Sequence, residues 1–583
     1  MAQNIITLNI NGKDVAVEQG STILQAAKSL NIHIPTLCHL EVGCIHMESR
    51  VSSCRICVVE VEGRRNLAPA CSTPVANGMI VRTNTKRAIK ARRTVLELLL
   101  SNHPFNCLTC AKSTECELQQ LAQEFGIEEV RYKGEQSHTA VDTSSYSIRR
   151  DMDKCIMCRR CETACNDVQT VGVLTGYGRG FDAKVTPADN MPLADSTCTF
   201  CGQCVNVCPV GALTEISYIR EVWDAINNPA KTVVVQTAPA VRVGIGEVFG
   251  LPNGVAATGK MVAGLKALGF DKVFDTDFAA DLTIMEEAHE FLQRLKKGEN
   301  LPILTSCCPG WVNFMEFQFP DLINIPSTCK SPQQMFGAIA KTYYAEKIGK
   351  KAEDIVVVSI MPCLAKKYEC NRDEFNSSGA KDVDYVLSTR ELAKMFKEAG
   401  VNIAELESAE YDNPLGESTG AAIIFGASGG VLEAALRTAY EWATGKELKD
   451  VDFKAVRGLA GVKEATIDVG GTKLNVAVTS GLGNARTVLE KIRRGEANYH
   501  AIEIMACPGG CLNGGGQPYI HGDQSKLEAR LAGIYAEDAG KPIRKSHENP
   551  FIKQLYKEFL GEPGGHKSHE LLHTHYHKKE SKG

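Results

Sequence analysis

The chain has 583 residues, too many for a single hydrophobic core, so several domains are expected. Its net charge of −4 argues against a broad nucleic-acid-binding surface, which needs a large excess of Lys and Arg. The 23 cysteines come without a secretion signal or an apolar run near 20 residues, which predicts no membrane span and reduced, metal-bound cysteines in an anaerobic, cytoplasmic protein.

Residues 1–80 are predicted to form a β-grasp domain that binds a [2Fe–2S] cluster, as plant ferredoxins do. Apolar residues alternate around Asn11-Gly12, which is typical of a β-hairpin, and the segment "TILQAAKSL" (22–30) reads as a helix. The predicted ligands are Cys38, Cys54, Cys57 and Cys71. Cys44 is an alternative to Cys38, which is preferred because it closely follows the helix.

Residues 81–133 carry His103-x3-Cys107-x2-Cys110-x5-Cys116. Three thiolates leave one iron of a [4Fe–4S] cluster without a ligand, and His103 is near enough in sequence to supply it. The alternative is a surface histidine beside a three-cysteine site. The polar stretch 134–147 that follows is predicted to be a linker.

Residues 148–222 contain a doubled cysteine pattern with the spacing of bacterial ferredoxins that hold two [4Fe–4S] clusters. In this pattern the fourth cysteine of each run binds the other cluster. The predicted ligand sets are therefore Cys155, Cys158, Cys161 and Cys208 for one cluster, and Cys198, Cys201, Cys204 and Cys165 for the second. Four-cysteine zinc sites are the alternative, but they seldom use two interlocked triplets.

Residues 223–522 alternate short β-branched runs with helix-like segments, which predicts an α/β domain of two lobes with parallel sheets covered by helices. Five cysteines follow three of the strand-like runs: Cys307, Cys308, Cys363, Cys507 and Cys511. Because the carboxyl ends of parallel strands share one edge, four of these thiols could meet and bind a further cluster. The alternative is that they are buried structural cysteines.

The segments "TSCCPGW", "MPCLAKK" and "MACPGGCLNGGGQP" resemble the three signatures of the [FeFe]-hydrogenases, and the front cysteine patterns resemble the multi-cluster members of that family. The resemblance implies an H-cluster: a [4Fe–4S] cubane joined to a two-iron site that carries CO, cyanide and an azadithiolate. It implies that Cys308, Cys363, Cys507 and Cys511 bind the cubane, with Cys511 as the bridge. Lys366 would hold a cyanide, and the pocket would be lined by Ala238, Pro239, Gln333, Met361 and Met505.

The resemblance also implies a proton relay that begins at a free Cys307 and continues through Glu287, Ser327 and Glu290. In the sequence, Glu287, Glu290 and Arg294 have the spacing of one helix face, for which a solvated stripe is the alternative. One departure from the family is Leu364, where a threonine is usual, so hydrogen bonding around the cubane is expected to differ.

The implied activity is reversible oxidation of hydrogen, with electrons relayed through one [2Fe–2S] and three accessory [4Fe–4S] clusters. The implied partners are hydrogen, protons, maturation proteins, and ferredoxin or a flavin–NAD(P) diaphorase subunit. The implied assembly is a hetero-oligomer that resembles the NAD(P)-linked, electron-bifurcating hydrogenases. The Gly-rich segments 244–250 and 480–485 lack G-x-G-x-x-G spacing, so no nucleotide site is predicted in this chain.

Two other functions fit parts of the sequence: an electron-wire subunit of the complex I or formate dehydrogenase type, which would share the front domains, and a hydrogen sensor. Residues 523–583 resemble the small-subunit-like C-terminal extension of the family. Their last stretch, "GGHKSHELLHTHYHKKESKG", is rich in His and Lys and is predicted to be a flexible tail rather than a metal site.

Overall fold

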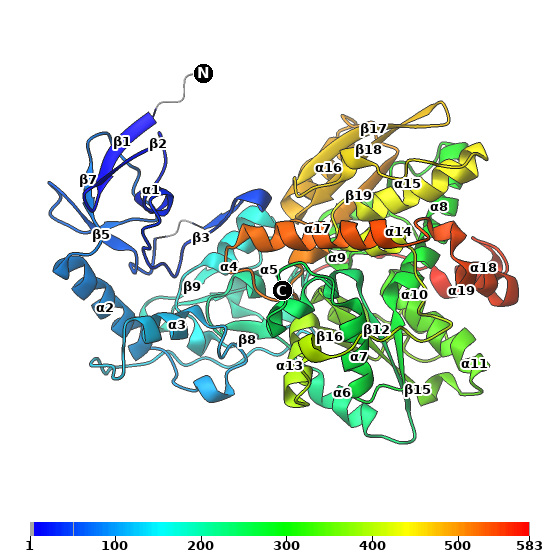
Figure 1. Ribbon diagram of the computed structural model, residues 1–583, viewed down its shortest axis with the longest axis horizontal. Helices are drawn as coiled ribbons and strands as arrows, with labels where there is room; N and C mark the ends of the chain where they lie inside the picture. Colours follow the sequence, from blue (N-terminus) through cyan, green and yellow to red (C-terminus); the bar gives the residue numbers. More distant parts are fainter. Residues whose placement is uncertain (1–4, 50–51, 582–583) are drawn as a thin grey trace.

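The computed structural model describes residues 5–49 and 52–581. The N-terminal domains lie at one end of the molecule and the α/β domain at the other, and the C-terminal helices pack on the α/β domain (Figure 1). Within the described part of the chain, no helix has both the length and the apolar character needed to cross a membrane.

The first domain is a five-stranded sheet in the order β2-β1-β7-β5-β6. Its elements are β1 Ile5–Ile10, β2 Lys13–Glu18, α1 Ile23–Ser29, β5 Val58–Val61, β6 Ala68–Pro69 and β7 Ile80–Arg82. Asn11 and Gly12 have φ values of 52° and 84°, as the tight turn of the expected β1–β2 hairpin requires. Outside this sheet, the chain forms a separate antiparallel hairpin from β3 Leu40–Val42 and β4 Met47–Ser49.

The helices α2 Lys86–Ser101 and α3 Glu117–Glu124 follow this sheet. The ferredoxin-like region, residues 148–222, then contains β8 Ile148–Arg150, α4 Arg160–Thr163, β9 Thr175–Tyr177, β10 Lys184–Thr186, α5 Gln203–Val207 and β11 Leu213–Glu215. The predicted linker 134–147 is irregular, but it is bonded to the domain it crosses: the Thr139 amide donates to Asp153 (2.6 Å) and Asp142 forms a bridge with Arg150.

The α/β domain contains two four-stranded sheets. The first has the order β13-β12-β15-β16 and is parallel throughout, from β12 Thr232–Thr237, β13 Lys272–Asp275, β15 Ile355–Met361 and β16 Tyr385–Ser388. The second has the order β14-β19-β18-β17, from β14 Ile303–Leu304, β17 Val462–Val469, β18 Thr472–Ser480 and β19 Ala501–Met505.

The prediction of purely parallel sheets is wrong for the second sheet, in which β17 and β18 are antiparallel. Only Gly470 and Gly471, both at positive φ, separate these strands. A turn this short can join only antiparallel neighbours, because a parallel pair needs a long crossover.

Helices cover both sheets. They are α6 Ile219–Ile226, α7 Thr258–Ala267, α8 Thr276–Lys297, α9 Pro309–Gln318, α10 Pro332–Ile339, α11 Ala345–Lys347, α12 Ala365–Glu369, α13 Thr389–Glu398, α14 Gly420–Ile423, α15 Gly430–Thr444 and α16 Leu482–Arg493. The helix α8 is almost completely buried over its first thirteen residues and packs against α10 and α15, so it lies at the centre of the domain.

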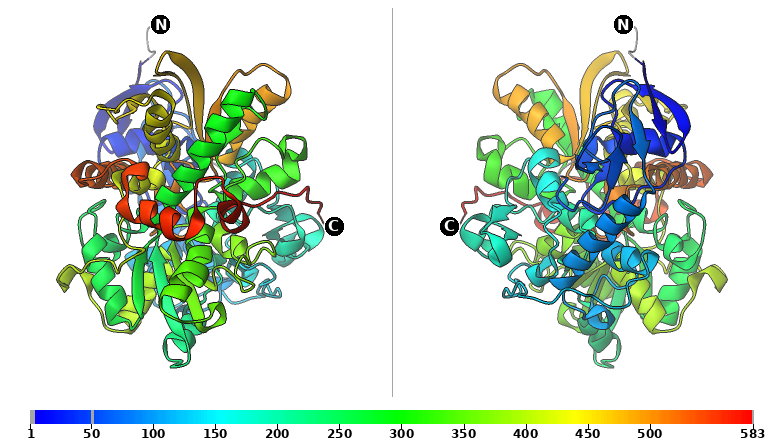
Figure 2. Two further views of the ribbon diagram at one scale, coloured as in Figure 1. Left: turned by 90° about the vertical axis from the view of Figure 1, so that its right-hand side faces the viewer. Right: turned by 90° about the vertical axis from the view of Figure 1, so that its left-hand side faces the viewer.

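The C-terminal region consists of α17 Gln524–Gly540, α18 Pro550–Leu555 and α19 His566–Leu572. The prediction of a flexible tail is wrong. After α19 the chain returns across the α/β domain to the side of the ferredoxin-like region, where the Ser581 hydroxyl donates to the Asp195 carbonyl at 3.2 Å (Figure 2). Leu571, Leu572 and Thr574 are buried, and burial of this kind holds a segment that its composition alone would leave free.

Candidate active site and cysteine clusters

Cysteines at the ends of three strands meet at one cavity of the α/β domain. Cys307 and Cys308 follow β14, Cys363 follows β15, and Cys507 and Cys511 follow β19. All except Cys507 line a cavity of about 80 Å³, and Cys507 is close enough to Cys363, Cys308 and Cys511 to be affected by their charges. The cavity exceeds the space needed for one water molecule, so it has room for a small non-protein group.

The cavity wall is mainly apolar, and it contains all five residues for which a lining role was expected. They are Ala238, Pro239, Gln333, Met361 and Met505. The Gln333 side-chain oxygen is buried and finds no hydrogen-bond partner among the described residues. Since a buried polar atom without a partner is costly, this oxygen suits a ligand in the cavity.

The thiols of this group share an electrostatic environment that favours a bound cation. Burial, and then the charge of Cys308, raise the pKa of Cys363 to about 12, although Lys366 acts in the opposite direction. Burial and neighbouring thiols raise the pKa of Cys507 well above its usual range. Four thiols packed this closely cannot ionise together without a compensating positive charge, which a metal cluster supplies.

Lys366 lies at the first turn of α12 and points to the same cavity. Its ammonium group donates to the Cys307 carbonyl at 3.0 Å and to Glu369 Oε2 at 2.9 Å. Burial would lower the pKa of Lys366, but Glu369, together with Cys363 and Cys307, outweighs burial and raises it. The lysine is therefore held as a cation at the cavity wall.

Glu369 was missed by the sequence reasoning. Its Oε2 accepts hydrogen bonds from Ser331 at 2.9 Å and Gln333 at 3.0 Å as well as from Lys366. Its position three residues after Lys366 on a short helix was a signal that could have found it. Thr276, Phe425 and Gly426 also line the cavity, and no spacing in the sequence connects them with the cysteines.

A chain of polar groups leads away from Cys307 toward the surface. Burial, and then Cys308 and Glu287, raise the pKa of the Cys307 thiol well above its usual range. The Glu287 carboxyl is buried and hydrogen-bonded with Ser327, and the Ser327 hydroxyl donates to Glu290 Oε2 at 2.9 Å. Arg294 then pairs with Glu290 Oε1 at 2.6 Å. Glu287, Ser327 and Glu290 are thus linked by hydrogen bonds, and Cys307 is close enough to Glu287 for their charges to interact.

The pKa of Glu287 is raised to about 8, first by burial and then by the negative charge of Glu290. A carboxyl group with a pKa near the working pH can both accept and release a proton, which is what a relay needs. Glu287 is thus suited to proton transfer rather than to a solvated stripe.

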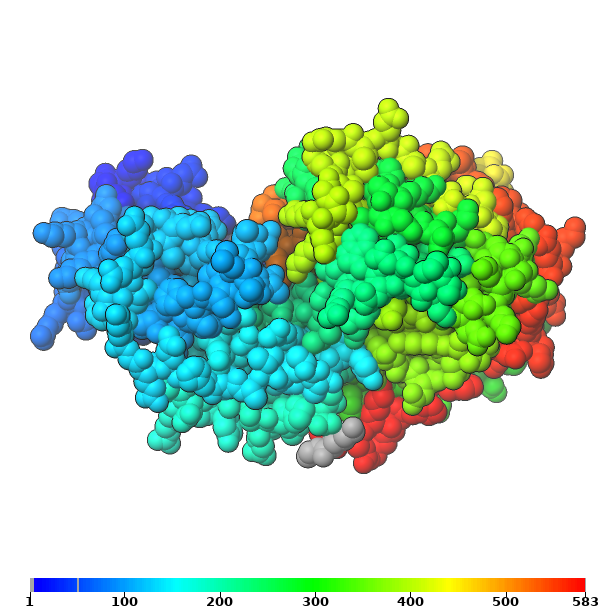
Figure 3. Space-filling view, turned by 90° about the horizontal axis from the view of Figure 1, so that it is seen from below, coloured from blue at the N-terminus to red at the C-terminus, as the bar shows by residue number. Residues whose placement is uncertain are grey.

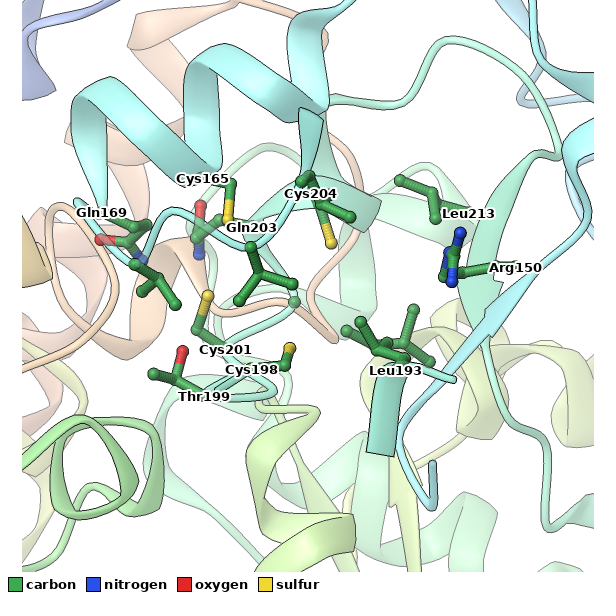
Figure 4. A pocket seen from close by; sticks show the side chains of 15 residues that line it. Arg150, Cys165, Gln169, Leu193, Cys198, Thr199, Cys201, Gln203, Cys204 and Leu213 are labelled. Carbon is green, nitrogen blue, oxygen red and sulfur yellow. The ribbon is translucent and has the colours of Figure 1, made fainter. Parts of the chain in front are cut away.

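In the ferredoxin-like region, the two interlocked cysteine sets are each brought together. Cys165, Cys198, Cys201 and Cys204 surround one small cavity, with their sulfurs pointing inward (Figure 4). A second cavity is lined by the other set: Cys155, Cys158, Cys161 and Cys208. Each cavity thus takes its fourth cysteine from the other run, as the crossed pattern predicts.

In the first domain, Cys38 approaches Cys54 and Cys71, and Cys57 also contacts Cys71. Cys44 lies apart from them, and its backbone amide donates to Gln524 at 3.0 Å. The geometry therefore groups Cys38, not Cys44, with the other three.

His103 lies beside the segment that carries Cys107, Cys110 and Cys116. Burial, and then Lys154, lower the pKa of His103 to about 4, so its ring is neutral. Its Nδ1 is buried and is bonded to no other described residue. Cys110 Sγ packs on Gly211 beside Lys154, which places it near the histidine, and Cys116 is close to Cys110. A neutral ring with an unused nitrogen has the chemistry of a metal ligand.

The chain matches five family models. Residues 231–515 match the iron only hydrogenase large subunit, C-terminal domain, and residues 524–579 match the iron hydrogenase small subunit. Residues 3–86 match a 2Fe-2S iron-sulfur cluster binding domain. Residues 92–131 match the NADH-ubiquinone oxidoreductase-G iron-sulfur binding region, and residues 145–214 match the ferredoxin-like domain of NADH-quinone oxidoreductase subunit 3.

Among curated proteins, the chain is 62% identical to the NADP-reducing hydrogenase subunit HndD of Solidesulfovibrio fructosivorans, over 99% of this chain and 100% of that protein. It is 40% identical to iron hydrogenase 1 of Clostridium pasteurianum, over 98% and 100% of the two chains. Among solved structures, it resembles an apo [FeFe]-hydrogenase, HydA1 from Chlamydomonas reinhardtii, with a TM-score of 0.56 and 45% identity over 62% of this chain and 99% of that one.

Proposed function

Because this chain belongs to the iron-only, or [FeFe], hydrogenase family, we propose that its strand-end cavity interconverts hydrogen with two protons and two electrons. The front domains, which belong to iron–sulfur families, carry the electrons. The observation that carries this proposal is the meeting of four cysteines from three strands beside a fifth, Cys307, from which a polar chain leads outward.

The donor set at the cavity fits an H-cluster. Cys308, Cys363, Cys507 and Cys511 are proposed as the cubane ligands, and Lys366 is the cation that would bind an anionic ligand such as cyanide. When bound, the H-cluster, with its two-iron unit, supplies the splitting of hydrogen and takes up the electrons. The protein supplies the thiols, an apolar wall that excludes water, and a route for the proton.

The proton route uses this chain's own residues. The Cys307 thiol exchanges a proton with Glu287, and the Ser327 hydroxyl passes it on to Glu290. Arg294 and the Thr328 amide hold the Glu290 carboxylate in place, at 2.6 Å and 3.0 Å. The steps through Ser327 are transfers between hydrogen-bonded groups, as general acid–base transfer requires.

The electron route leaves through the ferredoxin-like region. The cavity of Cys165, Cys198, Cys201 and Cys204 is proposed to hold the [4Fe–4S] cluster nearest the active site, because Cys201 is close enough to influence Cys507. The remaining carriers are a [4Fe–4S] cluster in the crossed cavity, a one-His-three-Cys [4Fe–4S] cluster at His103, and a [2Fe–2S] cluster at Cys38. These carriers are one [2Fe–2S] and three accessory [4Fe–4S] clusters, in addition to the H-cluster.

The name of the relative HndD, an NADP-reducing hydrogenase subunit, supports a place in a hetero-oligomer. We propose a flavin–NAD(P) diaphorase subunit or ferredoxin as the redox partner, and maturation proteins as the source of the two-iron unit. A cytoplasmic location stays a prediction. The electron-wire function is disfavoured because residues 231–515 match a hydrogenase domain. A measurement of hydrogen turnover with a low-potential dye separates the enzyme from the hydrogen sensor.

Replacing the free thiol tests the proton route. In Cys307→Ala, hydrogen evolution with a reduced low-potential dye should fall by more than about 100-fold, because the first proton carrier is lost. The infrared CO and cyanide bands of the anaerobically matured protein should persist. The matched control is Cys370→Ala, which removes a buried thiol that does not line the cavity and should leave turnover unchanged. Wild-type turnover in the Cys307 variant would contradict the route.

A further inference from the structure

The C-terminal segment after α19 lies directly on the stretch of chain that carries the relay serine. The Lys330 amide donates to the Leu572 carbonyl and the Thr574 amide donates to the Thr328 carbonyl, both at 2.8 Å. Cys329 and His573 form the antiparallel bridge between these bonds. In the view from below, the C-terminal segment forms the red edge beside the green α/β domain (Figure 3).

Residues 327–331 belong to no helix or strand, so they depend on their neighbours for their position. On one side the Ser327 amide donates to the Leu304 carbonyl of β14 at 2.7 Å. On the other side the C-terminal segment supplies the backbone bonds to Thr328 and Lys330. The relay segment is therefore held between the sheet and the C-terminus of the chain.

Two side chains of the C-terminal segment reach the relay residues themselves. The Tyr576 hydroxyl donates to the Ser327 carbonyl at 2.7 Å, and burial raises the pKa of Tyr576, so the group stays a donor. His573 Nδ1 lies 2.7 Å from the Thr328 hydroxyl. Thr328 in turn donates to Glu290 through its amide at 3.0 Å and its hydroxyl at 3.2 Å.

The second nitrogen of His573 is occupied as well. His573 Nε2 lies 3.1 Å from Glu286 Oε2, which also accepts the Gly564 amide at 2.7 Å. The ligand atoms of Glu290, Cys329 and His573 lie within 4.8 Å of one another, close enough for a metal ion. With both ring nitrogens in hydrogen bonds and Glu290 paired with Arg294, a positioning role explains these contacts without an ion.

We propose that His573 and Tyr576 are positioning residues of the proton path: Tyr576 fixes Ser327, and His573 fixes Thr328 against Glu290. This inference rests on the proposed hydrogenase function and deepens it. Proton transfer is efficient only when donor and acceptor stay within hydrogen-bond reach, so loosening Ser327 or Glu290 slows it. His573 and Tyr576 act through these two residues and do not carry the proton.

Three substitutions separate the relay contacts from simple anchoring of the segment. Tyr576→Phe removes only the hydroxyl. His573→Asn keeps a polar group near the position of Nδ1 and so retains the bond to Thr328, whereas His573→Gln reaches the position of Nε2 and retains the bond to Glu286. His575→Ala is the matched control, because this exposed histidine belongs to the same segment.

Each variant is matured anaerobically as the full chain and assayed for hydrogen evolution, solvent deuterium isotope effect and infrared CO and cyanide bands. Tyr576→Phe and His573→Gln should lose about tenfold in turnover, with a larger isotope effect and unchanged bands. His573→Asn and His575→Ala should stay close to the wild type.

The inference is overturned if Tyr576→Phe and His573→Gln match the control in turnover and isotope effect. It is also overturned if His573→Gln is active and His573→Asn is not, since the histidine would then only anchor the segment to Glu286. Loss of the infrared bands would assign the segment to cofactor assembly instead. A wild-type protein without turnover or bands would overturn the proposed function itself, so the two failures are distinguishable.

Discussion

Glu287 shows how its surroundings adapt an ordinary carboxyl group to proton transfer. It occupies the buried face of α8, where burial is the largest cause of its raised pKa. Ser327 and Arg294 lower the pKa but do not cancel the effect of burial. With a pKa of about 8, the side chain is mostly protonated at neutral pH and needs no counter-ion inside the protein.

Because of this raised pKa, the free energy of unfolding should depend on pH. Between its usual pKa of 4.5 and the folded value of about 8, Glu287 binds a proton only in the folded protein. It therefore stabilises the fold below pH 4.5, and this contribution, on the order of 5 kcal/mol, is lost as the pH rises to about 8.

Glu287→Gln should remove that slope, because an amide does not titrate. The measurement is the difference in the thermal unfolding midpoint between wild type and variant from pH 5 to pH 8, where the wild type should lose more than the variant. Glu346→Gln, at an exposed site, should leave the slope of the wild type unchanged. Parallel curves for Glu287→Gln and wild type would show that Glu287 is not held protonated.

At the scale of elements, the junction between the ferredoxin-like region and the α/β domain is built from tight backbone contacts. Gly202 lies between Cys201 and Cys204 at a φ of 76°. A Cβ atom there would meet Leu364 Cδ1 at 2.9 Å and Gly515 Cα at 3.0 Å. The sequence predicted only that Leu364 lacks the hydroxyl of the usual threonine beside Cys363. In the structure Leu364 is fully buried and fills this junction with its apolar side chain.

Gly202→Ala should therefore destabilise the junction. Overpacking adds about 1–3 kcal/mol to the strain of a side chain at positive φ. The matched control is Gly172→Ala, which has the same φ of 76° and no atom within 4 Å of the new Cβ. The thermal unfolding midpoint should fall further in Gly202→Ala than in Gly172→Ala, and equal losses would show that the junction can relax.

At the scale of the whole molecule, a buried ion pair joins the same two regions. Arg390 of α13 binds Glu215 of β11 at 2.9 Å and donates to the carbonyls of Gly515 and Gln517, both at 2.6 Å. Burial would raise the pKa of Glu215, but Arg390 and Lys394 outweigh burial and hold it below its usual range. The stability from this pair is present above the ordinary pKa of a glutamate and is lost as the pH falls.

Arg390→Ala should cost about 3–5 kcal/mol, because it leaves the Glu215 carboxylate buried without its partner. Arg493→Ala breaks an ion pair with Asp321 near the surface, where about 0–1 kcal/mol is expected. Limited proteolysis in the segment 216–231 between the two regions should be faster in Arg390→Ala alone. Similar cleavage in both variants would mean that the buried pair does not hold the regions together.

The short cysteine spacings of the front domains could be interpreted from the sequence because the reach of the chain decides them. Only two residues separate Cys198 from Cys201 and Cys201 from Cys204, so one compact loop brings their thiols to a single cavity. The helix that carries Glu287 and Glu290 was likewise predictable, since a 3.6-residue period is a local property. The strand-end positions of Cys363 and Cys507 followed from β-branched runs.

Tertiary structure alone decided what lies across from these groups. Glu369 accepts a hydrogen bond from Ser331, Phe425 lines the cavity, and the C-terminal segment bonds to Ser327. These distant segments meet because the domain buries its apolar surface in one core. Burial also made the His-rich tail ordered and set the pKa of Glu287, and neither follows from composition. Local geometry determined the ligand patterns, whereas packing between distant segments determined their electrostatics and support.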